Sequence, residues 1–176
     1  GLDFGNVGLV GILNADSQIF FPDFRAHEKA FQMLAQVAGR AGRKGERGLV
    51  LVQCSDPEHP VIDDVISNRY RNGYEREMQE RLEYHYPPFY RLIQVTLKHR
   101  DRQVLEERAA LLGSDLRKLF GRRVYGPEYP LASRLRGMYQ MELLLKIESK
   151  LSLKKVKVAL KDCLDAFQQN HKKSPL

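Results

Sequence analysis

The stretch Gln36-Val37-Ala38-Gly39-Arg40-Ala41-Gly42-Arg43 decides how the first part of the chain folds and what it binds. It places two arginines three residues apart, each directly after a glycine. Arginine carries a planar fork of donors that matches phosphate oxygens, and a neighbouring glycine lets an anion approach the backbone closely. The octet therefore predicts a phosphate-binding turn. The same spacing is also compatible with a flexible basic turn between a helix and a strand.

The segments on either side of the octet predict a strand, a helix and a second strand. Residues 7–13 form an apolar run typical of a strand that is buried on both faces of a parallel sheet. Apolar residues then recur at the helical period from about residue 25 to 37, and the glycines of the octet end that helix. Residues 49–52 are again apolar and strand-like. This order is a βαβ crossover, so the first part is predicted to be α/β.

Two proline-containing stretches divide the rest of the chain. After Asp56-Pro57-Glu58-His59-Pro60 the pattern predicts short helices over 61–66 and 74–82, and Tyr86-Pro87-Pro88-Phe89 then stops helix formation. We therefore predict three parts, which are residues 1–57, a helical connector over 58–85, and a C-terminal domain over 86–176.

The C-terminal part predicts a small α+β domain. A strand of alternating polarity over 91–98 is followed by a helix that Asp101 caps, and an extended stretch near Tyr125 precedes a strand over 140–147. A last helix begins after Ser152. The order strand, helix, strand, strand, helix is most of a split βαβ fold, as in ferredoxin-like and ribosomal-protein-like domains.

The net charge of +7 over 176 residues is concentrated near the C-terminus. Residues 1–60 hold 6 lysines and arginines against 7 acidic residues, whereas residues 101–176 hold 16 against 9. Concentrated positive charge indicates a protein that binds a polyanion, and a merely solvated basic face is the alternative.

Within that basic part, four arginines lie close to tyrosines. Arg122 and Arg123 precede Tyr125, and Arg134 and Arg136 precede Tyr139. Cations interleaved with aromatic rings can hold phosphates and stack an unpaired base, which predicts a DNA- or partner-binding surface. The alternative is that the tyrosines pack on the core while the arginines solvate a loop.

Membrane and secretory features are absent from the sequence. No apolar run is long enough to span a bilayer, and the first residues lack the features of a signal peptide. Cys54 and Cys163 have no C-x-x-C spacing, which argues against a disulfide framework and a zinc site and fits a reducing cytosol. We expect a cytoplasmic chain that holds no metal ligands of its own.

The octet resembles the Q-x-x-G-R-x-G-R motif of superfamily 2 helicases, and its surroundings are similar to the PriA family of bacterial replication-restart helicases. The likeness covers residues 1 to about 168. The residues that carry it, besides the octet, are Gly1-Leu2-Asp3-Phe4, Val7-Gly8-Leu9-Val10-Gly11-Ile12 with Ala15-Asp16, Pro22-Asp23-Phe24-Arg25-Ala26-His27-Glu28, Phe31-Gln32, Glu80-Arg81, Tyr86-Pro87-Pro88-Phe89, Tyr125-Gly126-Pro127 and Arg134-Leu135-Arg136-Gly137.

This resemblance implies that the first part is the end of the second RecA-like lobe of a helicase. Arg43 would be an arginine finger and Arg40 would contact the γ-phosphate of ATP bound with Mg²⁺. An arginine finger contributes about 10³ to 10⁵ in rate, because it stabilises charge on the transferred phosphoryl group. The other residues to which the resemblance gives a role in nucleotide binding are Gly1, Asp3, Gln36 and Gly39.

The resemblance also implies partners for the C-terminal domain: DNA, both single-stranded and at forks, the acidic tail of single-strand-binding protein, and other primosome proteins. The parent chain would couple ATP hydrolysis to DNA unwinding at stalled forks and to replisome reloading. The rival interpretation is a non-catalytic adaptor that binds nucleic acid or protein.

Several parts of a complete helicase have no counterpart in this sequence. The phosphate-binding G-x-x-x-x-G-K-[ST] loop, the acidic Mg²⁺-binding motif and the family's cysteine-rich zinc insertion are all missing. We therefore expect a C-terminal fragment of a longer protein that does not hydrolyse ATP by itself.

Overall fold

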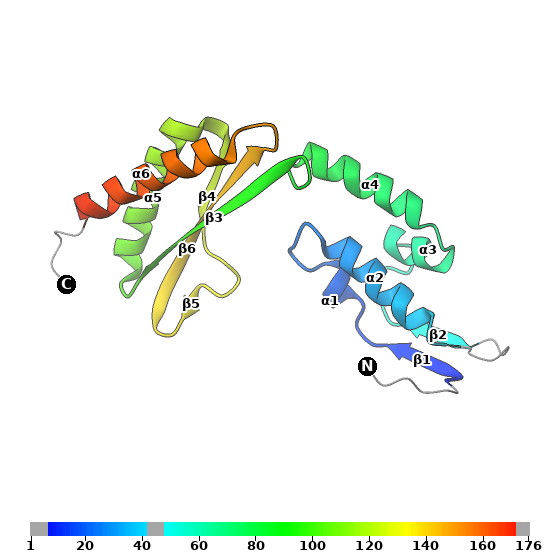
Figure 1. Ribbon diagram of the computed structural model, residues 1–176. Coiled ribbons are helices and arrows are strands. Elements are labelled where there is room, and N and C mark those ends of the chain that lie inside the picture. Colours follow the sequence, from blue (N-terminus) through cyan, green and yellow to red (C-terminus); the bar gives the residue numbers. More distant parts are fainter. Residues whose placement is uncertain (1–6, 42–47, 172–176) are drawn as a thin grey trace. The chain divides into compact units, whose positions relative to one another are not determined.

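The computed structural model describes residues 7–41 and 48–171, and these divide into two compact units. The first unit is Gly1–Glu83 and the second is Tyr84–Leu176. Both mix helices with strands (Figure 1), so the predicted α/β class and the small C-terminal domain are confirmed.

The first unit is built on a pair of parallel strands. These strands are β1 (Leu9–Ile12) and β2 (Leu49–Val52), paired from Leu9 opposite Leu49 to Ile12 opposite Val52. Between them in the chain come the short helix α1 (Asp16–Ile19) and the helix α2 (Ala26–Ala38). The predicted order of strand, helix and strand is therefore confirmed.

One face of this strand pair packs on a helical core and the other does not. The core consists of Ala15, Ile19, Ala30, Leu34, Val61 and Ile62. On the other face Leu9, Leu49 and Leu51 are each more than half exposed. The prediction of a strand buried on both faces is thus wrong for the described residues, because their helices cover one side only.

Two further helices complete the first unit, where the sequence predicts a connector. Helix α3 (Pro60–Ile66) contributes Val61 and Ile62 to the core, and α4 (Tyr70–Glu83) follows it. Ion pairs bind these helices to their neighbours: Arg76 of α4 contacts Asp64 of α3 at 2.7 Å, and Arg81 of α4 contacts Glu28 of α2 at 2.7 Å. Asp64 is itself buried, so its pairing with Arg76 offsets the cost of burying the carboxylate.

The second unit has the strand order of a split βαβ fold. Its strands are β3 (Tyr90–His99), β4 (Val124–Glu128), β5 (Arg134–Leu135) and β6 (Met138–Glu148). Strand β6 lies between β3 and β4 and is antiparallel to both, while β5 pairs with the start of β6. The predicted order of strand, helix, strand, strand and helix is present, with β5 added as the first arm of a hairpin.

Two helices cover one face of this sheet, as Figure 1 shows. They are α5 (Arg102–Phe120), which runs into the short 3-10 helix η1 (Gly121–Arg123), and α6 (Leu153–His171). The alternate residues Leu143, Leu145 and Ile147 of β6 are fully buried beneath them. The predicted cap of α5 is confirmed, because Asp101 Oδ1 accepts a hydrogen bond from the Val104 amide at 3.1 Å.

Candidate nucleic-acid interface

The predicted nucleotide-binding residues lie only partly within the described chain. Gln36, Gly39 and Arg40 are exposed at the C-terminal end of α2, where the Gly39 amide donates to Ala35 O at 3.0 Å and the Arg40 amide donates to Val37 O at 3.1 Å. The structure therefore places these three residues together on one turn. Gly1, Asp3 and Arg43 lie outside the described residues.

The hairpin that joins β5 to β6 carries three of the predicted DNA-contacting residues. Arg134 and Tyr139 are register partners, and the Arg134 guanidinium lies 5.0 Å from the centre of the Tyr139 ring. Arg136 and Gly137 turn the chain with φ of 51° and 79°. Both arginines are exposed, whereas Tyr139 also packs beside Leu105, Ala109 and Met141. The Tyr139 ring thus contacts the core on one side and the Arg134 guanidinium on the other.

The end of β3 brings further cations to this hairpin. His99 pairs with Tyr139 and Lys98 pairs with Gln140, so that Arg100 follows immediately at the same end of the sheet. Lys98 and Arg100 are exposed, with Lys98 on the face opposite to Tyr139. We call Lys98, Arg100, Arg134, Arg136 and Tyr139 the hairpin cluster. Sequence reasoning missed its first two members, although Lys98-His99-Arg100 is a basic run at the end of a predicted strand.

Arg122 and Arg123 lie at the opposite end of β6. The eleven-residue β6 rises about 3.3 Å per residue, so its ends are roughly 30 Å apart. Arg123 donates from Nε and Nη2 to the two carboxylate oxygens of Glu148, at 2.7 and 2.9 Å. This contact lowers the pKa of Glu148 and raises that of Arg123. The structure therefore does not bring the four predicted arginines into one site.

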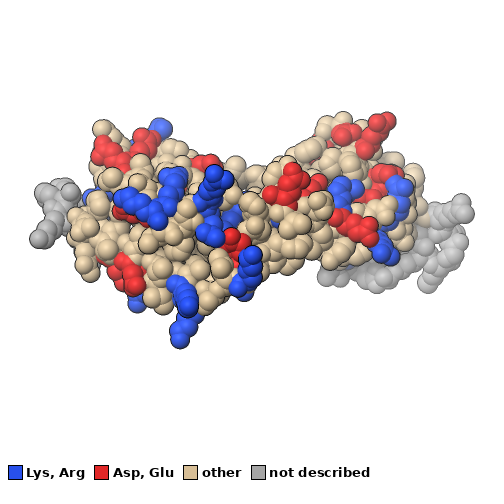
Figure 2. Space-filling view, turned by 90° about the horizontal axis from the view of Figure 1, so that it is seen from above, with Lys and Arg blue, Asp and Glu red and all other residues tan. Residues whose placement is uncertain are grey.

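Helix α6 presents a second cationic surface. Lys154, Lys157 and Lys161 recur along its exposed side and line a shallow groove with Leu153 and Val158. In Figure 2 lysines and arginines gather on the left-hand body, which is the second unit. That unit holds 19 lysines and arginines against 9 acidic residues, a net charge of +10, whereas the first unit holds 10 against 13. In the sequence, the spacing of these lysines by three and then four residues indicates that they share one side of a helix.

Unlike the exposed cations of the hairpin cluster and of α6, Lys146 makes its contacts within the second unit. Its residue is buried, its Nζ donates to Tyr84 O at 2.7 Å, and the same nitrogen lies 3.7 Å and 4.8 Å from the ring centres of Tyr86 and Tyr125. Burial lowers the pKa of Lys146. Tyr125, 40% exposed, thus stacks on a lysine of its own unit.

No cysteine arrangement in the structure fits a zinc site. Cys54 and Cys163 are both free thiols and belong to different units. Among the described residues one group of metal-ligating side chains does come together, His27 with Glu77 and Glu80 in the first unit, which the sequence analysis did not identify. His27 is some fifty residues from the two glutamates in sequence and meets them only because α2 packs on α4.

Within the described part of the chain, no helix is both long enough and apolar enough to cross a membrane.

Comparison with known proteins identifies relatives of both units. A family model described as the Primosomal protein N C-terminal domain matches residues 82–176. The chain is 37% identical over 155 residues to the replication restart protein PriA of Bacillus subtilis, an alignment that covers 87% of this chain and 19% of the relative. It is 35% identical over 159 residues to the protein of the same name from Haemophilus influenzae, covering 88% and 22% of the two chains. The chain thus spans about a fifth of the length of these relatives.

Proposed function

Because this chain belongs to the family of the Primosomal protein N C-terminal domain, we propose that it is part of a replication-restart helicase and that its second unit binds single-stranded DNA. Replication restart is the role printed in the names of its relatives. In this proposal the second unit holds DNA near a fork, while the parent protein unwinds the duplex and promotes replisome reloading.

The observation that carries the proposal is the hairpin cluster on a unit with a net charge of +10. Proteins that bind single strands combine cations, which follow the phosphates, with flat groups on which bases stack. The Arg134 guanidinium provides both properties, because one of its faces rests on Tyr139 while the arginine as a whole is exposed. Arg136 and Arg100 supply further charge within the same end of the sheet.

The lysines of α6 suit an acidic protein segment as well as DNA. Lys154, Lys157 and Lys161 alternate with the apolar Leu153 and Val158, so the groove offers both charge and apolar contact. We assign to this surface the acidic tail of single-strand-binding protein, with other primosome proteins as further partners of the second unit. Cation surfaces of this kind attract acidic chains over a range set by the salt concentration.

The first unit fits the proposal as the end of a second RecA-like lobe. Its parallel strands, its crossover helix α2 and the exposed turn with Gln36, Gly39 and Arg40 are the parts such a lobe needs at this point. Arg40 would contact the γ-phosphate and Arg43 would act as the arginine finger, with Gly1 and Asp3 near the nucleotide. The residues that bind the rest of ATP and Mg²⁺ would come from the parent protein.

Fluorescence anisotropy with a labelled single-stranded oligonucleotide tests the DNA assignment. Replacing Arg134 and Arg136 by alanine removes two charge-assisted contacts, and we expect each to cost about 1.5 kcal/mol or more. The double variant should therefore bind more than about a hundredfold more weakly. Arg71→Ala, which removes an exposed arginine from α4, is the matched control and should leave the affinity unchanged.

The second candidate function, a non-catalytic adaptor that binds nucleic acid or protein, predicts a different result in the same assay when its ligand is an acidic protein. An adaptor for an acidic protein would bind an acidic peptide through the α6 groove, and the oligonucleotide would neither bind tightly nor compete with the peptide. Oligonucleotide binding that is insensitive to the hairpin arginines would likewise contradict the proposal.

A further inference from the structure

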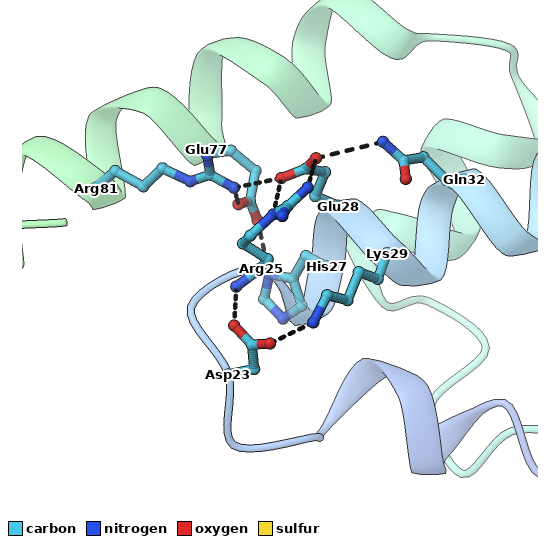
Figure 3. A network of polar contacts seen from close by, with 8 residues as sticks. All are labelled: Asp23, Arg25, His27, Glu28, Lys29, Gln32, Glu77 and Arg81. Carbon is cyan, nitrogen blue, oxygen red and sulfur yellow. Dashed lines mark hydrogen bonds and ion pairs between the residues drawn. The ribbon is translucent and has the colours of Figure 1, made fainter. Parts of the chain in front are cut away.

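His27, Glu77 and Glu80 form a compact group between two helices of the first unit. His27 lies in the first turn of α2, and the two glutamates lie one turn apart on α4. Their potential ligand atoms, a ring nitrogen and two carboxylate oxygens, all lie within 4.8 Å of one another. The shortest contact joins His27 Nδ1 to Glu77 Oε1 at 3.3 Å, and Figure 3 shows these two side chains pointing toward each other from the two helices.

A second layer of contacts fixes the orientation of Glu77. While Oε1 faces the histidine, Oε2 accepts a hydrogen bond from Arg81 Nη2 at 3.3 Å. The same Arg81 nitrogen donates to Glu28 Oε2 at 2.7 Å, so the charge of this arginine is shared with another carboxylate. The side chain of Glu77 is only 13% exposed. Outer contacts of this kind hold the ligands of metal sites in position.

The charge balance at the group favours a cation. Glu77, through its hydrogen bond, and Glu80 raise the pKa of His27, although partial burial and Arg76 oppose them. The same two carboxylates lie beside one imidazole nitrogen, and together these atoms are donors that suit a divalent ion bound to neutral histidine. Arg76 and Arg81 are the cations that face the group, and each is paired with a carboxylate outside it, Asp64 and Glu28 respectively.

The neighbouring His59 does not add a ligand to the group. The rings of His27 and His59 meet edge to face with centroids 5.2 Å apart. His59 Nδ1, however, accepts a hydrogen bond from the Val61 amide at 3.2 Å. In neutral His59 the proton therefore sits on Nε2, and the ring supplies no fourth ligand. A cavity of about 160 Å³ adjoins the group and is lined by His27 and Glu77 together with Phe31 and Met78. Solvent can thus complete the coordination of a bound ion.

From this juxtaposition we propose that His27, Glu77 and Glu80 bind one divalent transition-metal ion of the Zn²⁺ class. One imidazole nitrogen with two carboxylates and an open position is a ligand set that Zn²⁺ accepts, whereas Mg²⁺ and Ca²⁺ favour sites made of oxygen alone. A bound ion fastens the start of α2 to α4 and so braces the helix whose other end carries Gln36, Gly39 and Arg40.

Titration calorimetry with Zn²⁺ on the tag-free, chelator-treated chain tests the proposal. We expect one equivalent of Zn²⁺ to bind per chain. His27→Gln and Glu80→Gln should each weaken binding by more than about tenfold, which is the effect even of losing an outer contact of a metal site. Glu80→Gln leaves the His27–Glu77 pair in place and covers the case in which His27→Gln fails to fold.

Two control variants separate this site from other metal-binding groups of the chain. Glu75→Gln changes an exposed carboxylate on the same helix, and His99→Gln changes a histidine of the second unit. Both should retain the parent affinity. Zn²⁺ should also raise the melting temperature of the parent and of both controls, by mass action, but not that of His27→Gln. Equal affinity in the parent and in Glu80→Gln, or the absence of saturable binding, would overturn the proposal, and neither result bears on DNA binding.

Discussion

Arg123 and Glu148 form an ion pair with two hydrogen bonds, at 2.7 and 2.9 Å, which ties the 3-10 helix η1 to the last residue of β6. Arg123 also donates to Phe120 O at 3.3 Å, at the end of α5. One of the four arginines predicted to contact DNA is therefore engaged within its own unit. Our proposal therefore assigns DNA binding to Arg134 and Arg136 at the other end of β6, and the predicted role of the exposed Arg122 stays a prediction.

This pair should contribute to stability and not to DNA affinity. Because the Arg123 side chain is 40% exposed and solvent screens the pair, we expect Arg123→Ala to lower the free energy of unfolding by only about 1 kcal/mol. Urea denaturation of the second unit measures this change. The same variant should bind a single-stranded oligonucleotide like the parent, and a large loss of affinity would place Arg123 in the interface after all.

Glu28 should make the first unit sensitive to acid. Its pKa is lowered to about 2 from 4.5, by the hydrogen bond from Arg25 and then by that from Arg81. Since the folded pKa is the lower one, the stabilisation is complete above pH 4.5 and is lost as the pH falls toward about 2. We expect a change on the order of 1 kcal/mol, because the side chains remain partly solvated.

Hydrogen exchange of α2 amides between about pH 5 and pH 2.5 tests this expectation, with the intrinsic exchange rate taken into account. On acidification, the free energy of protection of the α2 amides should fall by about 1 kcal/mol less in Glu28→Gln than in the parent. His27, whose raised pKa lies above this range, is protonated throughout and does not contribute to the difference. An identical acid response in the two proteins would exclude Glu28 as the titrating group.

Gly126 should tolerate no side chain. Its φ is +85°, and an added Cβ would lie 2.6 Å from the backbone oxygen of Glu142 and 3.1 Å from the amide nitrogen of Glu128, where the pairing of β4 with β6 shifts register. Gly126→Ala should lower the free energy of unfolding by roughly 2–4 kcal/mol, since it adds a steric clash to a strained backbone.

Gly121 offers the matched control for this substitution. Its φ is +61°, but no described atom lies within 4 Å of the position of an added Cβ. With ψ of −133° this glycine lies outside the left-handed helical region, so Gly121→Ala should cost the backbone strain alone, about 1–3 kcal/mol, and less than Gly126→Ala. Equal losses for the two variants in urea denaturation would mean that crowding against β6 is unimportant.

Arg43 should matter only when the parent protein is complete. If it is the arginine finger, Arg43→Ala in the full-length protein should lower DNA-stimulated ATP turnover by about 10³-fold or more and leave the melting temperature unchanged. Steady-state phosphate release measures the effect, and Arg69→Ala on the same unit serves as the control. Turnover within a few-fold of the parent would remove the assignment.

Local patterns predicted most of the elements, because they depend on periodicity and capping. The apolar repeat fixed α2 to within one residue, and Asp101 was identified as a cap from its place before an apolar repeat. The exposed face of β1 and β2 was not predicted, because an apolar strand has the same residue pattern whether or not a second layer covers it. Whether that face is buried depends on the elements that pack against the strand and not on the strand's own sequence.

The site depended on register and helix packing, which sequence spacing does not specify. Arg122 and Arg134 are twelve residues apart in sequence, yet strand pairing places them at opposite ends of β6. The same pairing adds Arg100 to the hairpin, and the packing of α2 on α4 joins His27 to Glu77. The roles of Gly1, Asp3, Gln36, Gly39, Arg40 and Arg43 in nucleotide binding stay predictions.

The salt dependence of oligonucleotide binding tests the central claim most directly, because it counts the phosphates that the hairpin cluster neutralises. Each phosphate contact with a single strand adds about −0.7 to the slope of log K against log[salt]. Replacing both Arg134 and Arg136 by alanine should reduce the magnitude of this slope by about 1.4, whereas Arg123→Ala should leave it unchanged. An unaltered slope in the double variant would contradict the assignment of the β5–β6 hairpin as the DNA-binding site.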